Sequence, residues 1–416
     1  MTTEMIILVV AVSFGFYMAW NIGANDVANS MGTSVGSGAL TLKQAVIAAS
    51  IFNFAGAVLL GGNVTNTIRK GMINPDIFVH SPILLALGML AALIATGLWL
   101  QLATYYALPV STTHSIVGAI IGIGLIVGGI DALNWGKIFQ IFASWLISPV
   151  TGGLISFITF TFIKRKIIDT QFPIKNVKFY APYLVFIIFI TLTLSLIYKG
   201  MKNLHLNIPF GKAFIISLGV GILSFIVCNI LMKRIKEDHG NSLDKEFHGM
   251  EKIFVYLQII TAFYVAFAHG ANDVANSIGP LSAIVSVIQT NTVLMEVEVP
   301  FWILVLGGTG IAIGISTWGY KVMETIGKKI TELTPSRGFS AEFGAATTVL
   351  ICFRLGLPIS TTHTLVGSVI GVGLARGIAS LNFQVVKNIV LSWFVTLPFT
   401  TILSIIIYKI LVLLFI

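Results

Sequence analysis

GANDVANS, at residues 23–30, recurs letter for letter at residues 270–277. Each copy places an aspartate and two asparagines within a stretch that is otherwise apolar. Downstream, Leu-Pro-Val-Ser-Thr-Thr-His at 108–114 returns as Leu-Pro-Ile-Ser-Thr-Thr-His at 357–363. The offsets of 247 and 249 residues indicate that one long unit of the chain was duplicated.

The composition places this duplicated chain in a membrane. Hydrophobic residues make up 56% of it and charged residues only 10%, with a mean hydropathy of +0.95. Apolar runs of roughly 20 residues can cross about 30 Å of hydrocarbon, and these runs lack the alternation of a membrane barrel. The runs are 4–22, 41–62, 82–108, 112–130, 136–163, 180–199, 210–232, 251–275, 300–320, 341–357, 361–375 and 384–414. We therefore expect an all-α polytopic membrane protein with about twelve transmembrane helices.

The duplication divides the chain into three parts. We expect a first transmembrane repeat at 1–163, a connecting segment with two helices at 164–250, and a second repeat at 251–416. Seven runs precede the run that carries the second octapeptide, and this odd number predicts that the second repeat is inverted. The count assumes that the run after the first proline motif crosses once. Re-entrant hairpins at 108–130 and 357–375 are the alternative.

The basic residues predict the orientation. With the N-terminus outside, the segments that face inward hold 17 Lys and Arg residues, and those that face outward hold 7. Cytoplasmic loops of membrane proteins carry the excess of Lys and Arg. We therefore expect both termini outside, in a plasma or inner membrane. The net charge of +9 then reflects topology rather than nucleic-acid binding.

The octapeptide carries groups that lipid does not tolerate. Gly23 and the neighbouring amides predict an unwound segment that lines a polar cavity, because unpaired backbone groups are costly in hydrocarbon. Asp26 and Asp273 have no Lys or Arg on their own runs, and a buried carboxylate needs a cation, a proton or a basic partner. These carboxylates, with the side-chain carbonyls of Asn25 and Asn272, suit a hard cation such as sodium. A single asparagine within a membrane helix is as typical of helix–helix hydrogen bonding as of ion binding. Two identical copies of the octapeptide favour an ion site.

The proline motif predicts the start of a helix in each half. Ser111 and Ser360 stand at the N-cap position, and the unpaired N–H groups and partial positive charge beyond them attract anions. The hydroxyls of each Ser-Thr-Thr triplet add hydrogen-bond donors. A capped helix after a turn is the plainer interpretation of one copy. Two copies favour an oxyanion that is held by neutral donors.

The two motifs complement each other electrically. Carboxylates beside a phosphate-like anion repel it unless cations lie between them, so each ion favours the binding of the other. The octapeptides would then hold the driving ion and the helix starts the substrate. Sodium ions are the coupling ions we expect, and no cofactor is expected.

At these motifs the chain resembles the inorganic phosphate transporter family, the PiT type of sodium- or proton-coupled carriers. The resemblance covers both repeats, about three quarters of the chain, and the residues at 274–277 are similar to the sodium-coupled branch. It implies inorganic phosphate as substrate, symport with sodium and an inverted-repeat helical fold. The implied phosphate ligands are Ser111, Thr112, Thr113, Ser360, Thr361, Thr362, Asn25 and Asn272, and the implied sodium ligands are Asp26, Asp273, Asn25 and Asn272. Proton coupling, sulfate as substrate and a homodimer are left open.

Three histidines near the motifs are weaker candidates. His114 and His363 follow the two triplets, and we expect them to pack or to support the site from one helical turn below, rather than to couple protons. His269 precedes the second octapeptide where Ile22 precedes the first. This asymmetry argues against an essential role for His269.

Other polar residues within the apolar runs are given structural roles. Gln258, on the run that leads to the second octapeptide, is a weak candidate for a ligand near the entrance of the site. Arg354 is expected to pair with an acid such as Glu342. Cys228 and Cys352 are expected to be buried thiols, because neither has a histidine or an acid at ligand spacing.

Two other functions are compatible with parts of this pattern. A cation channel also uses paired aspartates within the membrane, but the paired anion motif favours an occluded carrier site. A membrane enzyme such as a phosphatase is not expected. The sequence has no Cys/His or Ser/His/Asp arrangement outside the repeats and no nucleotide-type phosphate loop.

Overall fold

The computed structural model describes residues 2–61, 71–200, 208–235, 243–294, 297–354 and 359–416. Within these ranges the chain is helical and forms no β-strand, which confirms the expected all-α class. The longer helices are α1 (Thr3–Asp26), α2 (Ala28–Gly36), α3 (Leu42–Leu60), α5 (Pro82–Tyr105), α6 (Thr112–Gly128), α7 (Trp135–Ile163), α8 (Pro173–Gly200), α9 (Phe210–Arg234), α10 (Leu243–Asp273), α11 (Ala275–Thr290), α12 (Phe301–Trp318), α14 (Pro335–Arg354), α15 (Thr361–Arg376) and α16 (Phe383–Phe415). The shorter ones are α13 (Tyr320–Glu324), two π-helical turns, η4 (Lys164–Ile168) and η6 (Thr325–Lys329), and three 3-10 turns, η2 (Pro75–Phe78), η3 (Ile130–Ala132) and η7 (Ile378–Ser380).

Each predicted apolar run overlaps one long helix. Within the described residues, nine helical segments are long and apolar enough to cross a membrane, so the protein is a multi-pass membrane protein. Two of these segments are composite, because α1 continues into α2 and α10 continues into α11. α6 and α15 have 17 and 16 residues, fewer than the roughly 20 that a full crossing needs.

Both octapeptides are helical apart from an interruption of one residue. Val27 alone separates α1 from α2, and Val274 alone separates α10 from α11. The expectation of an unwound segment at Gly23 is therefore wrong, because Gly23 lies inside α1. A Cβ there would meet the backbone oxygen of Ile311 on α12 at 2.0 Å. Glycine is needed for the close approach of two helix backbones and not to break a helix.

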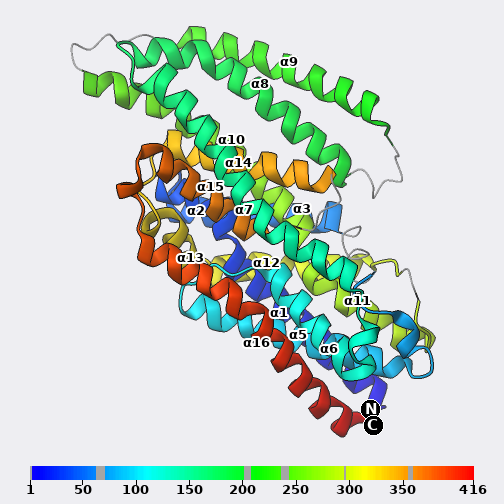
Figure 1. Cartoon of the computed structure of the whole chain (residues 1–416). Helices are drawn as coiled ribbons and strands as arrows, with labels where there is room; N and C mark the ends of the chain where they lie inside the picture. The colour runs from blue at the N-terminus through cyan, green and yellow to red at the C-terminus, as the bar shows by residue number, and fades with distance from the viewer. Residues whose placement is uncertain (1, 62–70, 201–207, 236–242, 295–296, 355–358) are drawn as a thin grey trace.

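The two repeats pack on each other reciprocally. α1 packs on α12, whereas α10 packs on α3, and Gly270 approaches the backbone of Asn53 as Gly23 approaches that of Ile311. In the same manner α6 packs on α16, and α15 on α7. α1 and α10 run in opposite directions, and the two chain termini lie at the same end of the molecule (Figure 1). Each repeat thus completes the core of the other.

Two helical hairpins carry the proline motifs. α5 packs on α6, and residues 106–111 join them. α14 packs on α15, and residues 355–360 join them, although 355–358 lie outside the described residues and include the second motif's leucine and proline. The start of α6 and the start of α15 each lie at the tip of a hairpin. The described starts of α6 and α15 lie in the interior, because Ser111, Thr112, Ser360 and Thr362 are buried.

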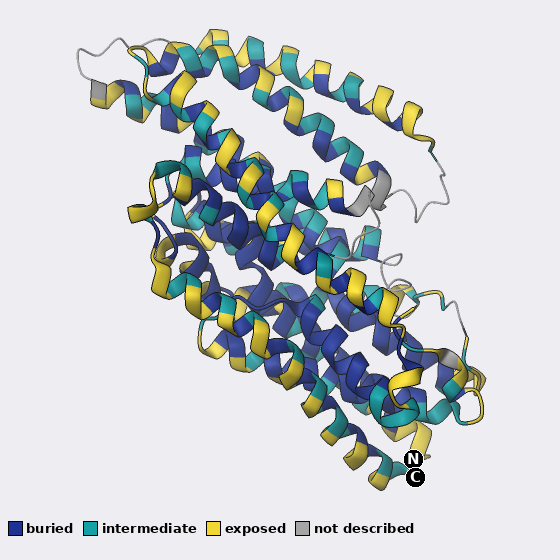
Figure 2. Cartoon of the chain, in the orientation of Figure 1, coloured by how far each residue is buried: buried dark blue, intermediate teal, exposed yellow. Residues whose placement is uncertain are grey.

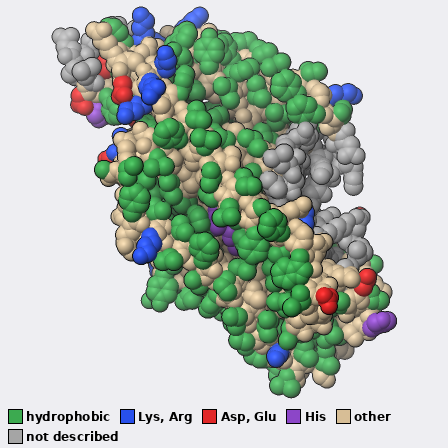
Figure 3. All heavy atoms as spheres, in the orientation of Figure 1, with side chains coloured by type: hydrophobic (Ala, Val, Ile, Leu, Met, Phe, Trp, Pro, Cys, Tyr) green, Lys and Arg blue, Asp and Glu red, His purple; other side chains and the backbone are tan. Residues whose placement is uncertain are grey.

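The buried residues, which include the polar side chains of the motifs, lie in the interior, and the exposed surface is largely apolar. Figure 2 shows the buried segments gathered through the middle of the molecule, with exposed residues along the outer sides of α9 and α16. In the most apolar 18-residue stretch of α5, 78% of the residues are buried, whereas in that of α9 only 17% are buried. Figure 3 shows a face that is largely hydrophobic, with Lys and Arg gathered at its upper left. This distribution suits a protein that is surrounded by lipid.

The α1–α12 contact gives a test of the reciprocal packing. A Cβ on Gly314 of α12 would lie 1.8 Å from the carbonyl oxygen of Trp20 on α1, so Gly314→Ala must push the helices apart. We expect a destabilisation of about 1–3 kcal/mol, measured as a lower Tm in detergent. Gly219→Ala on α9 is the matched control, because a Cβ there meets nothing within 4 Å. The Tm of Gly219→Ala should equal or exceed that of the wild type, since alanine favours the helix. Equal Tm values for the two variants would contradict the packing.

Candidate functional site

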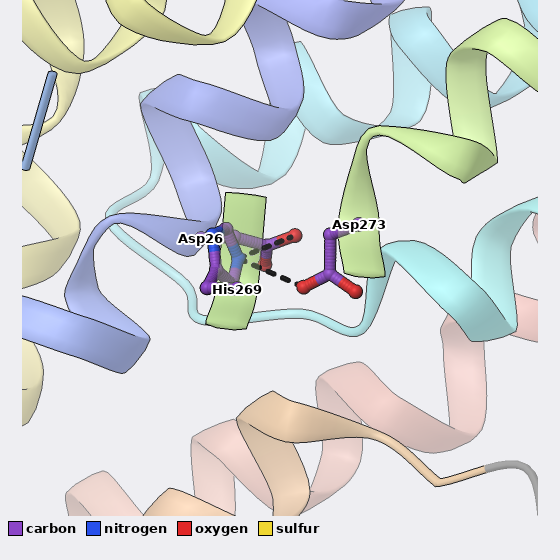
Figure 4. A group of neighbouring side chains, drawn as sticks. All are labelled: Asp26, His269 and Asp273. Atoms are coloured by element: carbon purple, nitrogen blue, oxygen red, sulfur yellow. Dashed lines mark ion pairs between the residues drawn. The ribbon is translucent and has the colours of Figure 1, made fainter. Parts of the chain in front are cut away.

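The two octapeptide aspartates meet in the interior. Asp26 ends α1 and Asp273 ends α10, and their side chains are 1% and 2% exposed. Nε2 of His269 lies 2.8 Å from Oδ2 of Asp273 and 3.9 Å from Oδ2 of Asp26. Figure 4 shows the imidazole of His269 joined by dashed lines to both carboxylates. Ligand atoms of all three residues lie within 4.8 Å of one another, and this is close enough for the group to hold a metal ion.

Hydroxyls from both hairpin tips donate to these carboxylates. Thr112, at the start of α6, donates to Oδ2 of Asp26 at 2.5 Å. At the start of α15, Thr362 donates to Oδ1 of Asp26 at 3.4 Å, and Thr361 donates to Oδ2 of Asp273 at 3.2 Å. Asp26 of the first repeat thus accepts from both repeats. The four motifs, distant in sequence, form one polar site.

The predicted N-caps are confirmed at both helix starts. Ser111 Oγ accepts the backbone N–H of His114, and Ser360 Oγ accepts that of His363, each at 3.2 Å. The first N–H groups of α6 and α15 precede these bonded ones and have no partner within their own helix. Thr113, the remaining predicted hydroxyl, is partly buried. The serines act as caps here, and the threonines carry the hydroxyls that reach the carboxylates.

The asparagines of the two octapeptides make different contacts. Nδ2 of Asn25 donates to Thr104 Oγ1 at 2.9 Å and to the carbonyl of Leu108 at 3.1 Å, while its Oδ1 accepts the N–H of Val110 at 3.2 Å. Asn25 therefore fastens the tip of the first hairpin to α1. Asn272 is partly buried and donates to Oδ1 of Asp273 at 2.8 Å. The two amides are equivalent in sequence but not in environment.

A third asparagine of the first octapeptide also lies at the centre. Nδ2 of Asn29 donates to Oγ1 of Thr362 at 2.8 Å and to Oδ1 of Asp26 at 3.2 Å. Asn29 thereby joins the start of α2 to the start of α15. Asn29 is not among the ligands that the sequence predicts.

His269 is the central residue that the sequence analysis underrated. Its Nδ1 lies 2.6 Å from Oδ1 of Asn53, and the amide nitrogen of Asn53 donates to the carbonyl of Ala49. This network assigns the donor role to Nδ1 and directs Nε2 to the carboxylates. The signal in the sequence is its position four residues before Asp273, because such residues are neighbours on one helix face. The expectation that His269 has no essential place is therefore not supported by its position, because it contacts both aspartates although the first repeat has no counterpart.

A buried carboxylate apart from the aspartate pair lies beside α2. Glu342 of α14 is 0% exposed, and its Oε1 accepts from Thr33 at 2.6 Å, Ser34 at 2.8 Å and Gln258 Nε2 at 3.2 Å. Its Oε2 accepts from Thr261 of α10. We call these five residues the Glu342 cluster. The predicted partner of Glu342, Arg354, has a side chain outside the described residues.

A cavity of about 40 Å³ opens beside the aspartates. Asn29, His269 and Thr361 line it, together with Ser195 of α8, Tyr264 of α10 and apolar residues of α14. A volume above roughly 10–15 Å³ accommodates a water molecule. Solvent or a small ion therefore has room next to the carboxylates.

The family model that matches the chain, over residues 22–404, is described as the phosphate transporter family. The chain is 47% identical over 408 residues to a Pyrococcus furiosus protein named "Putative phosphate permease", covering 98% of this chain and 97% of the relative. It is 43% identical to the chloroplastic inorganic phosphate transporter 2-1 of Arabidopsis thaliana, covering 94% of this chain and 70% of the relative.

A solved structure is also similar. It is titled "The sodium-dependent phosphate transporter", matches with a TM-score of 0.88 at 43% sequence identity, and covers 98% of this chain and 99% of that chain. At this level of identity the likeness extends beyond the helical architecture to the sequence itself.

Asn25 provides a test of how the first hairpin tip is held. Asn25→Ala removes three hydrogen bonds and leaves the N–H of Val110 and the carbonyl of Leu108 without partners, at about 1–3 kcal/mol for each buried group. We expect amide hydrogen exchange in residues 106–111 to become at least about tenfold faster. Asn272→Ala is the matched control, because its amide contacts Asp273 and not this tip. Similar exchange in both variants would contradict the assignment.

Proposed function

Because the chain belongs to the phosphate transporter family, we propose that it imports inorganic phosphate by symport with sodium ions through alternating access. The printed title of the solved relative names sodium dependence for that protein. The observation that carries the proposal is the contact between both octapeptide aspartates and hydroxyls at two helix starts. Groups suited to a cation and groups suited to an oxyanion thus lie in one buried site.

The carboxylates explain why a cation must accompany the anion. Two like unit charges 4 Å apart repel by about 4 kcal/mol at an effective dielectric constant of 20. Phosphate beside Asp26 and Asp273 therefore binds only when positive charge offsets this repulsion. Carboxylate and hydroxyl oxygens are ligands suited to a hard cation such as sodium. Each ion then increases the affinity of the site for the other, which is the thermodynamic basis of coupling.

The threonine hydroxyls supply a physical route from sodium to phosphate. Thr112 donates its proton to Asp26, and the single hydroxyl proton of Thr362 is shared between Asp26 and the carbonyl of Val110. A hydroxyl has one donor and two acceptor lone pairs, so its oxygen can bind a sodium ion while its proton turns to a phosphate oxygen. Sodium that binds Asp26 would thereby release donors for the anion. We therefore propose that sodium binds before phosphate.

The proposed phosphate ligands are the hydroxyls and amides that the two motifs supply, together with the helix starts. They are Ser111, Thr112, Thr113, Ser360, Thr361, Thr362, Asn25 and Asn272, and the sodium ligands are Asp26, Asp273, Asn25 and Asn272. Asn25 can serve only through lone pairs left over from its contacts at the hairpin tip. Ser111 and Ser360 already accept one N–H each as caps and still have a proton to donate.

We also propose the Glu342 cluster as a second place for sodium. A carboxylate with 0% exposure and three hydroxyl partners provides oxygen ligands, and burying a lone carboxylate in a membrane protein is costly. Thr33 of the cluster lies one helical turn beyond Asn29 on α2, so the two places share one helix face. A cation at Glu342 would therefore bias the position of α2.

The proposed arrangement in the membrane is an inverted repeat of residues 1–163 and 251–416, with a connecting segment at 164–250. The opposite directions of α1 and α10 in Figure 1 support it. A hairpin of α5 and α6 would enter and leave the membrane on the same side, so these two runs would add no net crossing. Five of the seven preceding runs then cross the membrane, and this odd number still predicts an inverted second repeat. The hairpins would enter from opposite sides, and both termini would lie outside a plasma or inner membrane.

Proton-coupled symport is the second candidate, and His269 is the observation that favours it. Its Nε2 faces both carboxylates, so a proton on this nitrogen would occupy the place of a coupling cation. Proteoliposomes with sodium and proton gradients imposed separately distinguish the two candidates. Uptake driven by sodium alone supports the first, and uptake driven by protons alone supports the second.

The aspartates provide the main test of the proposed function. We expect Asp26→Asn and Asp273→Asn each to lower sodium-driven phosphate uptake by about 100-fold or more, because breaking a buried charge interaction costs about 3–5 kcal/mol. Asp131→Asn, at an exposed position in η3, is the matched control and should transport like the wild type. The measurement is initial uptake of labelled phosphate into proteoliposomes. Full sodium-driven uptake by both buried variants would refute the ion assignment.

Glu342→Gln tests the second place for sodium. The substitution keeps the shape and most hydrogen bonds of the side chain but removes its charge. We expect the half-saturating sodium concentration for uptake to rise at least about threefold, with the half-saturating phosphate concentration at saturating sodium nearly unchanged. Glu324→Gln, at an exposed position on α13, is the control. A selective effect on phosphate would argue against a cation at this position.

A further inference from the structure

Four aromatic rings form a row behind the two helix starts. His114 stacks on Trp145 with ring centroids 3.4 Å apart and an interplanar angle of 27°. His363 stacks on Trp393 at 3.7 Å and 21°. The two imidazoles meet edge to face at 4.2 Å and 75°. We call these four residues the aromatic row. Its two halves are equivalent in sequence, so the row lies where the repeats meet.

Each histidine belongs to the first turn that carries the candidate hydroxyls. His114 is the third residue of α6 and His363 the third residue of α15, and their N–H groups bond to the cap serines. Both rings are buried. A displacement of either ring therefore moves the helix start, and with it the threonine that contacts an aspartate.

The row also ties each half to the other half's helices. Nε1 of Trp393 donates to the carbonyl of Pro109, just before α6, at 3.2 Å. Oγ1 of Thr362 donates to the carbonyl of Val110 at 3.2 Å. Apart from these contacts, α6 packs mainly on α16 and α15 mainly on α7. The row and these two hydrogen bonds therefore join the two helix starts, in addition to the shared acceptor Asp26.

We propose that the aromatic row is the positioning element that fixes the spacing of the two helix starts, so that donors from both repeats reach one oxyanion. The inference rests on the proposed phosphate site. None of the four rings needs to touch the anion. The stacked pairs hold each histidine by one face, and the edge-to-face contact sets the distance between the repeats, which is the geometry that aromatic pairs favour. Loss of one stack would weaken anion binding while leaving the carboxylates intact.

Trp145 allows the cleanest test. Its Nε1 is buried without a hydrogen-bond partner among the described residues, so Trp145→Phe removes no hydrogen bond and keeps a stacking ring. Trp145→Leu removes the stack. Trp302→Leu, at an exposed tryptophan at the start of α12, is the matched control. We would measure phosphate binding at saturating sodium and sodium binding without phosphate by calorimetry, on the full chain in detergent, together with Tm.

The expected result is a selective loss. A stacked pair contributes about 0.5–1.5 kcal/mol, so Trp145→Leu should bind phosphate about two- to twelvefold more weakly and bind sodium within about twofold of the wild type. Trp145→Phe should restore phosphate binding to within about twofold. An equal loss of sodium and phosphate binding, or a lower Tm with unchanged phosphate binding, would overturn the proposal.

Hydrogen exchange separates this inference from the proposed function. Without any ligand, amides in the first turn of α6 should exchange faster in Trp145→Leu than in Trp145→Phe. Unchanged exchange would overturn the positioning role even if phosphate binds. If the wild type binds no phosphate, the proposed function fails, and faster exchange would still support the row as a positioning element. Trp393→Leu repeats the comparison from the other half should Trp145→Leu not fold.

Discussion

Two carboxylates that contact one imidazole set the requirements for the rest of the interior. Asp26 and Asp273 come from different repeats, and Nε2 of His269 lies near both. In apolar surroundings their mutual repulsion is unfavourable by several kcal/mol unless protons, cations or donors offset it. The threonines at the hairpin tips and Asn29 are such donors. The apolar helices that surround this site can face lipid because the polar groups are collected in one place.

Duplication explains the frame of this site but not all of its chemistry. The reciprocal packing of α1 on α12 and of α10 on α3 follows from two copies of one unit, and so do the paired caps at Ser111 and Ser360. The charged neighbourhood is not symmetric, because His269 stands opposite Ile22 and Asn25 and Asn272 have different partners. A symmetric frame with unequal halves suits a carrier, since the states that open to each side need not have equal energy.

The sequence could predict features that depend on local pattern. Hydropathy located the longer described helices other than α2 and α11, and the proline motif predicted both N-caps, because each signal is contained in a few consecutive residues. Contacts between helices could not be predicted in this way. From the sequence, Gly23 is interpreted as a helix breaker, and only the structure shows that the backbone of Ile311 lies against it. From the sequence, Asn25 is interpreted as an ion ligand, and only the structure shows its hydrogen bonds to Leu108 and Val110 at the hairpin tip. The contact of His269 with Asp26 joins two helices that are far apart in sequence, and the first repeat has Ile22 at the equivalent position, so the duplication does not predict it.

The use of neutral donors at the helix starts has a consequence for coupling. A lysine or arginine placed between the carboxylates and the anion would offset the repulsion permanently, and phosphate would then bind without sodium. Hydroxyls such as that of Thr112 cannot do this, because they are dipoles whose protons are engaged by Asp26. Only a mobile cation can satisfy the carboxylate and free the donor at the same moment. In the proposed symport, the link between the two ions therefore arises because the described residues that donate to the aspartates at the threonine contacts are neutral. A lysine or arginine inserted there would produce a binder and not a carrier.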